Sequence, residues 1–168
     1  MRQRTNPREG KNGIIYAMRE MKILFVCHGN ICRSPMAEFV MRHLVDEAGL
    51  KHIEVASAAL HTDEIGSDTH YGTKEVLRRE GIPFSRRQAR LLGAEELGDW
   101  DLIIGMDRAN MRDLERLAHG KRLENMHMLL EFAGRDGEEV ADPWYTRDFD
   151  ATFRDVMQGC KALLSRLT

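Results

Sequence analysis

Cysteine is scarce in this 168-residue chain: there are three, and two of them lie in one short stretch. So few cysteines do not indicate a secreted domain that is stabilised by disulfides. No apolar run approaches the roughly 20 residues that a membrane span needs, and the N-terminal segment lacks the apolar stretch of a secretory signal. These absences favour a reducing, cytoplasmic setting, in which a reactive thiol stays reduced.

An excess of charge of one sign is also missing, since 25 Lys and Arg residues face 27 Asp and Glu residues. A nearly balanced chain has no electrostatic reason to bind nucleic acid or an anionic membrane, so we expect neither as a partner. The histidines show no ligand-like spacing, so we expect no metal and no cofactor. Repeats and low-complexity tracts are absent, and the length suits one domain with its own core.

Residues 1–20 and 21–168 differ in pattern. The first segment is polar and unpatterned, with breakers at Asn6-Pro7 and Asn12-Gly13, so we predict a mobile N-terminal extension. In residues 21–168, apolar strand-like runs alternate with helical patterns, which is typical of parallel βαβ units covered on both faces. We therefore predict a single three-layer α/β domain with a four-stranded parallel twisted sheet.

The boundaries follow from periodicity and from Gly, Pro and capping residues. The expected strands are Lys22–Val26, Ile53–Ala56, Asp101–Met106 and Asn125–Leu130. The expected helices are Ser34–Ala48, Asp68–Glu80, one capped by Asp107 that runs to about Ala118, and Ala151–Leu167, with a helical turn at Ala94–Leu97 and a loop at Ala141–Tyr145.

The stretch VCHGNICRSP, residues 26–35, joins the first apolar run to the first helix. It puts Cys27 at the carboxyl end of a buried strand, where open parallel sheets bind ligands. Five residues separate Cys27 from Arg33, so the intervening amides can point inward as a nest for a tetrahedral oxyanion. The helix N-terminus adds donors and a positive dipole end. This field favours a thiolate, so we interpret Cys27 as a nucleophile rather than a buried apolar cysteine.

Other residues of this stretch suit a phosphate. The planar fork of Arg33 can hold two phosphoryl oxygens. Gly29 and Asn30 both tolerate the left-handed backbone that a curled loop requires. Ser34 has two possible roles, as the helix N-cap or as a hydrogen-bond donor to the Cys27 sulfur. The expected phosphate-binding residues are His28, Gly29, Asn30, Ile31, Cys32 and Arg33.

Residues 26–35, with Ile103–Asp107 and Asp142–Tyr145, resemble the signature of the low-molecular-weight protein tyrosine phosphatase family. The resemblance extends from about Met21 to the C-terminus. It implies the four-stranded sheet with helices on both faces, and it makes Cys27 the nucleophile, Arg33 the phosphate clamp and Asp142 the general acid. The implied reaction is hydrolysis of phosphotyrosine or aryl phosphates through a cysteinyl-phosphate, by a monomer or weak dimer.

The chemistry supports those roles. A phenol has a pKa of about 10, and a carboxylic acid that protonates such a leaving group typically contributes about 10²–10⁴-fold. Asp142 must then be protonated when substrate binds, and its carboxylate later activates water. The alternative for Asp142-Pro143 is a simple turn. No metal is needed, because the loop amides and Arg33 neutralise the equatorial oxygens.

Trp144 and Tyr145 are either core aromatics or, with Ile31, the wall of a slot that stacks on an aryl substrate. A deep slot of that kind excludes phosphoserine, whose stem is short. The resemblance also puts Asp107 near the catalytic loop, where it can orient Arg33 in addition to capping a helix.

The resemblance further implies that Ser57 supports Asn30 by hydrogen bonding. Related sequences often carry a histidine where this chain has Arg87, so we do not transfer that supporting role, and we interpret Arg86–Arg90 as a solvated or acid-paired stretch. The region Glu64–Gly66 lacks the tryptophan that some members have at the cleft rim. Substrate preference is therefore less constrained than catalysis.

Cys32 has either a redox or a structural role. In family members with this second cysteine, peroxide joins the two sulfurs in a disulfide that protects the nucleophile. Cys160 shares a helical face with apolar residues and is predicted to lie in the core.

Three other functions compete. Protein arginine phosphatases share the scaffold, but that specificity is associated with threonine where this chain has Ile31. A thioredoxin-coupled arsenate reductase needs two more cysteines on a mobile segment, and residues 51–142 contain none. A non-catalytic phosphotyrosine reader would not need Cys27, Arg33 and Asp142 together.

Overall fold

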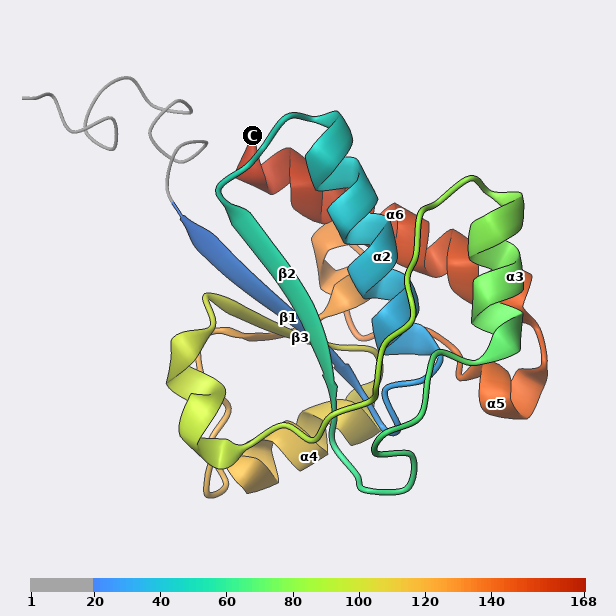
Figure 1. Ribbon diagram of the computed structural model, residues 1–168. Helices are drawn as coiled ribbons and strands as arrows, with labels where there is room; N and C mark the ends of the chain where they lie inside the picture. The colour runs from blue at the N-terminus through green and yellow to red at the C-terminus, as the bar shows by residue number, and fades with distance from the viewer. Residues whose placement is uncertain (1–19) are drawn as a thin grey trace, which may run out of the picture.

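The computed structural model describes residues 20–168, so the extension expected at residues 1–20 lies, apart from an exposed Glu20, outside the described residues. Four parallel strands form one sheet in the order β2-β1-β3-β4. The strands are β1 (Met21–Cys27), β2 (Ile53–Ala59), β3 (Leu102–Gly105) and β4 (Met126–Met128). Helices cover both faces of this sheet (Figure 1). The predicted α/β architecture is confirmed.

Side chains of the central strand β1 alternate between two cores. Phe25 and Cys27 point toward one cluster of buried residues, and Leu24 and Val26 point toward another. Burial on both faces explains why this strand is continuously apolar. The first face is covered by α2 (Arg33–Glu47), α3 (Tyr71–Arg79), α6 (Phe149–Leu167) and η2 (Leu129–Ala133), and the second by η1 (Ala94–Asp99) and α4 (Arg108–Leu117).

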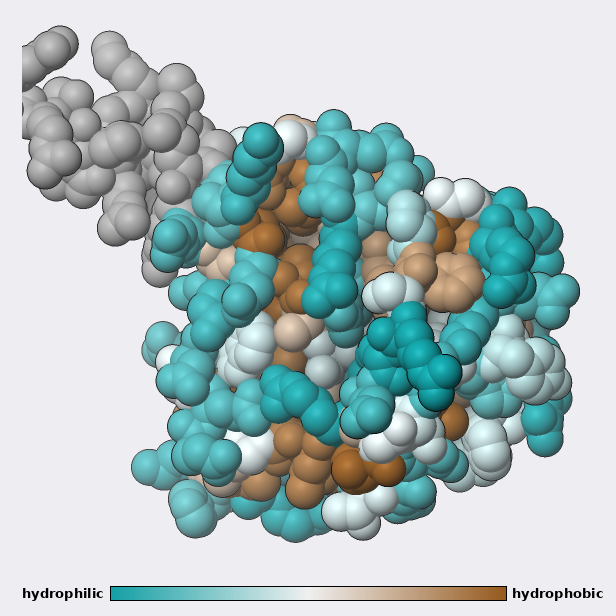
Figure 2. Space-filling view, in the orientation of Figure 1, coloured by the Kyte–Doolittle hydropathy of each residue, from teal (hydrophilic) through white to brown (hydrophobic). Residues whose placement is uncertain are grey.

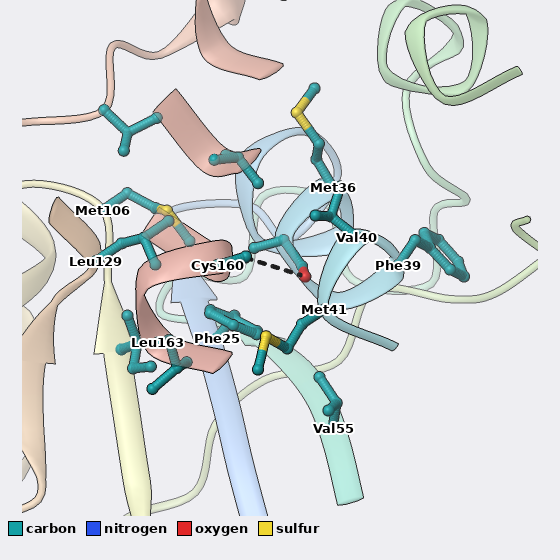
Figure 3. Packing of buried hydrophobic residues seen from close by; sticks show 14 of the residues in the cluster. Phe25, Met36, Phe39, Val40, Met41, Val55, Met106, Leu129, Cys160 and Leu163 are labelled. Atoms are coloured by element: carbon teal, nitrogen blue, oxygen red, sulfur yellow. Dashed lines mark hydrogen bonds between the residues drawn. The ribbon is translucent and has the colours of Figure 1, made fainter. Parts of the chain in front are cut away.

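The larger core contains Cys160, as the helical pattern predicted. Figure 3 shows this side chain packed among Phe25, Met41 and Leu163, with its thiol directed at the carbonyl oxygen of Ala37. Cys160 is fully buried. On the face drawn in Figure 2, hydrophilic side chains interrupt the hydrophobic surface. Within residues 20–168, no helix combines the length and the apolarity needed to cross a bilayer.

Local contacts shift some predicted boundaries. Helix α2 begins at Arg33 with Cys32 as its N-cap, so Ser34 is not the cap and lies inside the first turn. Helix α3 begins three residues later than expected because His70 caps it, its Nδ1 accepting from the Gly72 amide at 3.0 Å. The expected loop at 141–145 contains a short helix, α5 (Pro143–Thr146), capped by Asp142.

Candidate active site

A cleft of about 310 Å³ opens at the carboxyl end of β1. The chain leaves the strand at Cys27, passes through residues 28–32 and enters α2, so the predicted loop forms the floor of the cleft. Three other segments reach the same cleft: residues 63–64 after β2, the start of α4 and the segment around α5. The lining residues are Cys27, His28, Gly29, Ile31, Cys32, Arg33, Asp63, Glu64, Asp107, Ala109, Asn110, Asp113, Asp142, Trp144 and Tyr145.

The Cys27 sulfur lies within reach of hydrogen-bond donors at the base of this cleft. The residue is 4% exposed. Its Sγ lies 3.0 Å from the hydroxyl oxygen of Ser34 and accepts from the Ser34 amide at 3.4 Å. Because that amide belongs to the first turn of α2, the sulfur faces the positive end of a 15-residue helix. These two contacts hold the sulfur at the N-terminus of α2.

Arg33 is buried and held on one side. Its Nη1 donates to Asp107 Oδ2 at 2.7 Å and to the Val140 carbonyl at 2.9 Å. Its Nη2 makes only a longer contact, 3.4 Å, to Asp142 Oδ2. Burial alone disfavours the charged guanidinium, but Cys27, Asp107 and Asp142 raise the pKa of Arg33 above its ordinary value. Because these contacts occupy Nη1, the opposite edge of the guanidinium is left to donate to two phosphate oxygens.

Asp142 faces the cleft from the N-cap of α5. Its Oδ1 accepts from the Trp144 amide at 3.1 Å, while Oδ2 is directed at Arg33. The structure thus brings Cys27, Arg33 and Asp142 into one cleft. Trp144 is 46% exposed and Tyr145 81% exposed, so the two aromatics lie at the mouth rather than in the core.

Asn30 and Ser57 meet behind the loop. Asn30 is fully buried and left-handed, with φ of 60°. Its Nδ2 donates to Ser34 Oγ at 2.8 Å and to Ser57 Oγ at 2.9 Å. Ser57 in turn donates to the buried carboxylate of Glu38. The expected Asn30–Ser57 contact is therefore present. Neither side chain lines the cleft, so both can affect it only by holding the loop in place.

Arg87 makes supporting contacts that the sequence analysis did not transfer to it. Its Nη1 donates to the Asn30 carbonyl at 2.9 Å, and its Nη2 donates to Asn30 Oδ1. Of the predicted solvated or acid-paired stretch, Arg90 does pair with Glu96 at 3.0 Å, but Arg87 supports the loop. The contact joins residues 57 positions apart, so only the resemblance pointed to this position, and the arginine differs from the histidine of related sequences.

The sequence analysis missed two histidine–carboxylate pairs at the rim. His28 pairs with Asp63 at 3.0 Å and His61 pairs with Asp113 at 2.8 Å. The two imidazole rings stack, with centroids 4.0 Å apart. The hydrogen bond from His28 lowers the pKa of Asp63. Among residues 20–168, no group of three or more His, Cys, Asp or Glu side chains is arranged to hold a metal ion.

Cys32 is the second thiol of the same loop. It is 4% exposed. Burial, together with the nearby Cys27 and Asp142, raises the pKa of Cys32 to about 12. At neutral pH it is therefore a protonated thiol.

Comparison with known proteins gives consistent matches. The family model described as low molecular weight phosphotyrosine protein phosphatase matches residues 22–168. The low molecular weight protein-tyrosine-phosphatase YfkJ of Bacillus subtilis is 40% identical over 149 residues, covering 88% of this chain and 96% of the relative. The YfkJ crystal structure superposes with a TM-score of 0.84, covering 88% of this chain and 94% of that one.

Two further similarities bear on specificity. The low molecular weight protein-tyrosine-phosphatase PtpA of Staphylococcus epidermidis is 34% identical over 142 residues, covering 84% of this chain and 90% of the relative. The crystal structure of a Drosophila arginine phosphatase is 30% identical, with a TM-score of 0.79, and the match covers 87% of this chain and 97% of that one.

Proposed function

We propose that this chain, which belongs to the low molecular weight phosphotyrosine protein phosphatase family, hydrolyses phosphotyrosine through a cysteinyl-phosphate intermediate. Family membership makes it a hydrolase of the protein-tyrosine-phosphatase kind. The observation that carries the finer proposal is the convergence of Cys27, Arg33 and Asp142 on one cleft.

The first step transfers the phosphoryl group to sulfur. The Cys27 thiolate attacks phosphorus while the bond from phosphorus to the tyrosine oxygen breaks, and Asp142 gives that oxygen its proton. Arg33 and the loop amides stabilise the equatorial oxygens. In-line transfer requires the sulfur and the acid to lie on opposite sides of the phosphorus, and both residues line the one cleft.

The second step returns the enzyme to its starting state. The Asp142 carboxylate removes a proton from water as the water oxygen attacks phosphorus. The S–P bond breaks, inorganic phosphate forms and Cys27 leaves as a thiolate. A hydrogen bond from the Ser34 hydroxyl stabilises that leaving sulfur, as the distance of 3.0 Å allows.

Phosphotyrosine in proteins is the proposed substrate class. The nucleophile is 4% exposed whereas Trp144 is 46% exposed, so a substrate must reach from the aromatic mouth to a buried sulfur. A phenyl ring spans such a slot and stacks on its wall, including Ile31. A phosphoserine stem does not reach the sulfur.

The competing functions differ in what they require. Arginine phosphatase activity would use the same nucleophile with a guanidino leaving group, and the similar Drosophila structure makes it the main competitor. Arsenate reduction requires a relay of accessible cysteines, and Cys160 is fully buried in the core. We propose a cytoplasmic enzyme, because the mechanism needs Cys27 reduced, that acts as a monomer or weak dimer.

Reversible oxidation is part of the proposal. Peroxide would convert the Cys27 thiolate to a sulfenic acid and release hydroxide. The Cys32 thiol would then displace water from that sulfur to form a disulfide. The raised pKa of Cys32, about 12, makes Cys27 the sulfur that is oxidised first.

One comparative assay tests the proposed function. The purified protein is offered a phosphotyrosine peptide, the matching phosphoserine peptide, a phosphoarginine peptide and arsenate with thioredoxin. We expect turnover of phosphotyrosine, none in Cys27→Ser, and far slower turnover of the others. Faster hydrolysis of phosphoarginine would assign the chain to arginine phosphatases, and near-normal turnover by Cys27→Ser would exclude the covalent mechanism.

A further inference from the structure

Four aromatic rings form a cluster beside the mouth of the cleft. His70 is at its centre: the imidazole stacks on Tyr71, with ring centroids 4.6 Å apart, and on Phe149, with centroids 5.1 Å apart. The edge of Trp144 meets the same imidazole at 6.0 Å. Of these four residues, which we call the aromatic cluster, only Trp144 lines the cleft. The other three rings therefore extend the aromatic surface beyond the place where the phosphoryl group is transferred.

The aromatic cluster is joined to the phosphate loop as well as to the mouth. The His70 amide donates to the carbonyl oxygen of Ile31 at 2.8 Å, and Ile31 lines the cleft. In Figure 1, α5 lies next to the start of α3, so that the segments carrying Trp144 and Tyr71 are neighbours. A polypeptide whose phosphotyrosine enters the cleft, and which leaves the mouth over Trp144, therefore passes the aromatic cluster.

Much of the ring surface in the aromatic cluster faces solvent. Tyr71 is 72% exposed and Trp144 is 46% exposed. Within residues 20–168, the exposed Trp and Tyr side chains are these two and Tyr145, at the same mouth, whereas the exposed large aliphatic ones are Ile65 and Leu91. Exposed apolar surface that is gathered in one place marks an interaction site, and aromatic side chains are enriched in protein interfaces.

The central imidazole is uncharged at neutral pH. Its Nδ1 accepts from the Gly72 amide at 3.0 Å, and a backbone amide can only donate, so the ring proton lies on Nε2. Burial, followed by the nearby Arg147, lowers the pKa of His70, whereas Glu64 acts in the opposite direction. Because Arg147 and Glu64 have opposite charges, the surroundings favour neither an acidic nor a basic occupant. An apolar side chain suits this surface.

We propose that the aromatic cluster binds a large apolar side chain of the substrate protein, two or three residues from the phosphotyrosine. The inference rests on the proposed function and names the sequence that the enzyme prefers around the phosphorylated residue. An extended chain advances about 3.3 Å per residue. Two or three residues therefore cover the ring separations of 6.0 Å and 4.6 Å that lead from Trp144 through His70 to Tyr71.

Binding of phosphopeptides to the Cys27→Ser protein tests the proposal without turnover. Two phosphotyrosine peptides have the same length and net charge. They differ only at the second and third positions on both sides of the phosphotyrosine, which are Leu in one peptide and Ser in the other. We expect the Leu peptide to bind about tenfold more tightly, because its apolar side chains leave water on binding. Equal dissociation constants for the two peptides would overturn the proposal.

Substitutions in the same Cys27→Ser protein locate the preference. Tyr71→Ser removes the most exposed ring of the aromatic cluster and should reduce the preference for the Leu peptide to about twofold. Tyr71→Phe keeps the ring and should retain it. Leu91→Ser is the matched control, because it removes a 45% exposed apolar side chain outside the cluster, and it should also retain the preference. A melting temperature for each variant confirms that it is folded. A full preference in Tyr71→Ser would overturn the proposal.

A second copy of the chain is the alternative occupant of the aromatic cluster. Sedimentation velocity of the unmodified protein and of Tyr71→Ser separates the two cases, and we expect both proteins to sediment alike. A dimer that forms in the unmodified protein but not in Tyr71→Ser would assign the cluster to contacts between copies and overturn the proposal. Turnover of phenyl phosphate, which has no flanking residues, tests the proposed function separately. Its failure would contradict the phosphatase chemistry, whereas the peptide preference is decided by binding alone.

Discussion

Arg33 Nη1 donates a hydrogen bond of 2.7 Å to Asp107 Oδ2, which joins the first turn of α2 to the N-cap of α4. Only 3% of the Arg33 side chain is exposed, against 20% for Asp107. The ion pair therefore fixes the orientation of the buried Arg33 side chain, whose guanidinium lines the cleft.

Replacing Asp107 should leave the Arg33 guanidinium less firmly oriented toward the cleft. Asp107→Asn keeps a side-chain oxygen to cap α4 but loses the charge-assisted bond, which is worth about 1.5–3 kcal/mol. We expect kcat/KM on an aryl phosphate to fall by about 10- to 100-fold. Asp113→Asn, in the same cleft but paired with His61, is the control, and equal losses in both variants would remove Asp107 from the orienting role.

Asp142→Asn should lose rate in proportion to the difficulty of the leaving group. The Asn side-chain oxygen can still cap α5, but an amide is not acidic enough to protonate the leaving oxygen. On phenyl phosphate we expect a loss of about 10²–10⁴-fold in kcat, and on an activated dinitrophenyl phosphate a far smaller one. Asp148→Asn, which changes the cap of α6 on the same segment, should affect both substrates equally little. Equal losses in Asp142→Asn would contradict the acid role.

The sequence predicted that Cys27 and Arg33 lie in one site because both belong to one continuous loop between a strand and a helix. Asp142 came instead from a resemblance, since Asp-Pro is also an ordinary turn signal. The contact of Glu38 could not be predicted, because it exists only after β2 folds against the loop. The role of Arg87 was not transferred, because related sequences often have a histidine at that position. Ser34 was ambiguous for a local reason: a cap and a donor to sulfur have the same sequence signal.

Cys32→Ser should change recovery from peroxide but not the initial loss of activity. In the unmodified protein, dithiothreitol should restore activity, because Cys32 resolves the oxidised sulfur as a disulfide. Without Cys32 the sulfenic acid proceeds to irreversible states. Cys160→Ala, in the fully buried core, should recover like the unmodified protein. Full recovery of Cys32→Ser would show that no Cys27–Cys32 disulfide protects the enzyme.

Asp68 should contribute stability that depends on pH. Burial opposes its ionisation, but hydrogen bonds from Lys74 Nζ and from the Arg87 and Thr69 amides lower the pKa of Asp68 to about 2. A folded-state pKa below the unfolded value of about 4 stabilises the fold above pH 4, and the benefit is lost as the pH falls through 2.

Denaturant unfolding from pH 7 to pH 2 checks this expectation. Asp68→Asn should be less stable than the unmodified protein at pH 7, and the difference in unfolding free energy should shrink between about pH 4 and 2. Asp46→Asn, at an exposed position of α2, should show no such convergence. A difference for Asp68→Asn that stays constant with pH would exclude the ionised contacts as its origin.

Gly72 makes room for the aromatic contact that supports the Asp142 segment. A Cβ at Gly72 would lie 2.5 Å from the Phe149 ring, and that ring stacks on His70 with centroids 5.1 Å apart. The edge of Trp144 meets the same imidazole at 6.0 Å. Gly72→Ala must therefore displace the Phe149 ring at the start of α6, and with it the stacking on His70 beside the Asp142 segment.

We expect Gly72→Ala to cost about 1–3 kcal/mol of stability, as overpacking usually does, and to slow phenyl phosphate more than dinitrophenyl phosphate. Gly98→Ala is the matched control, because no atom lies within 4 Å of the added Cβ. A loss of stability with equal loss on both substrates would mean that Phe149 supports the fold but not the acid. The selective loss would instead identify His70 and Phe149 as the packing that keeps Asp142 within reach of the leaving oxygen.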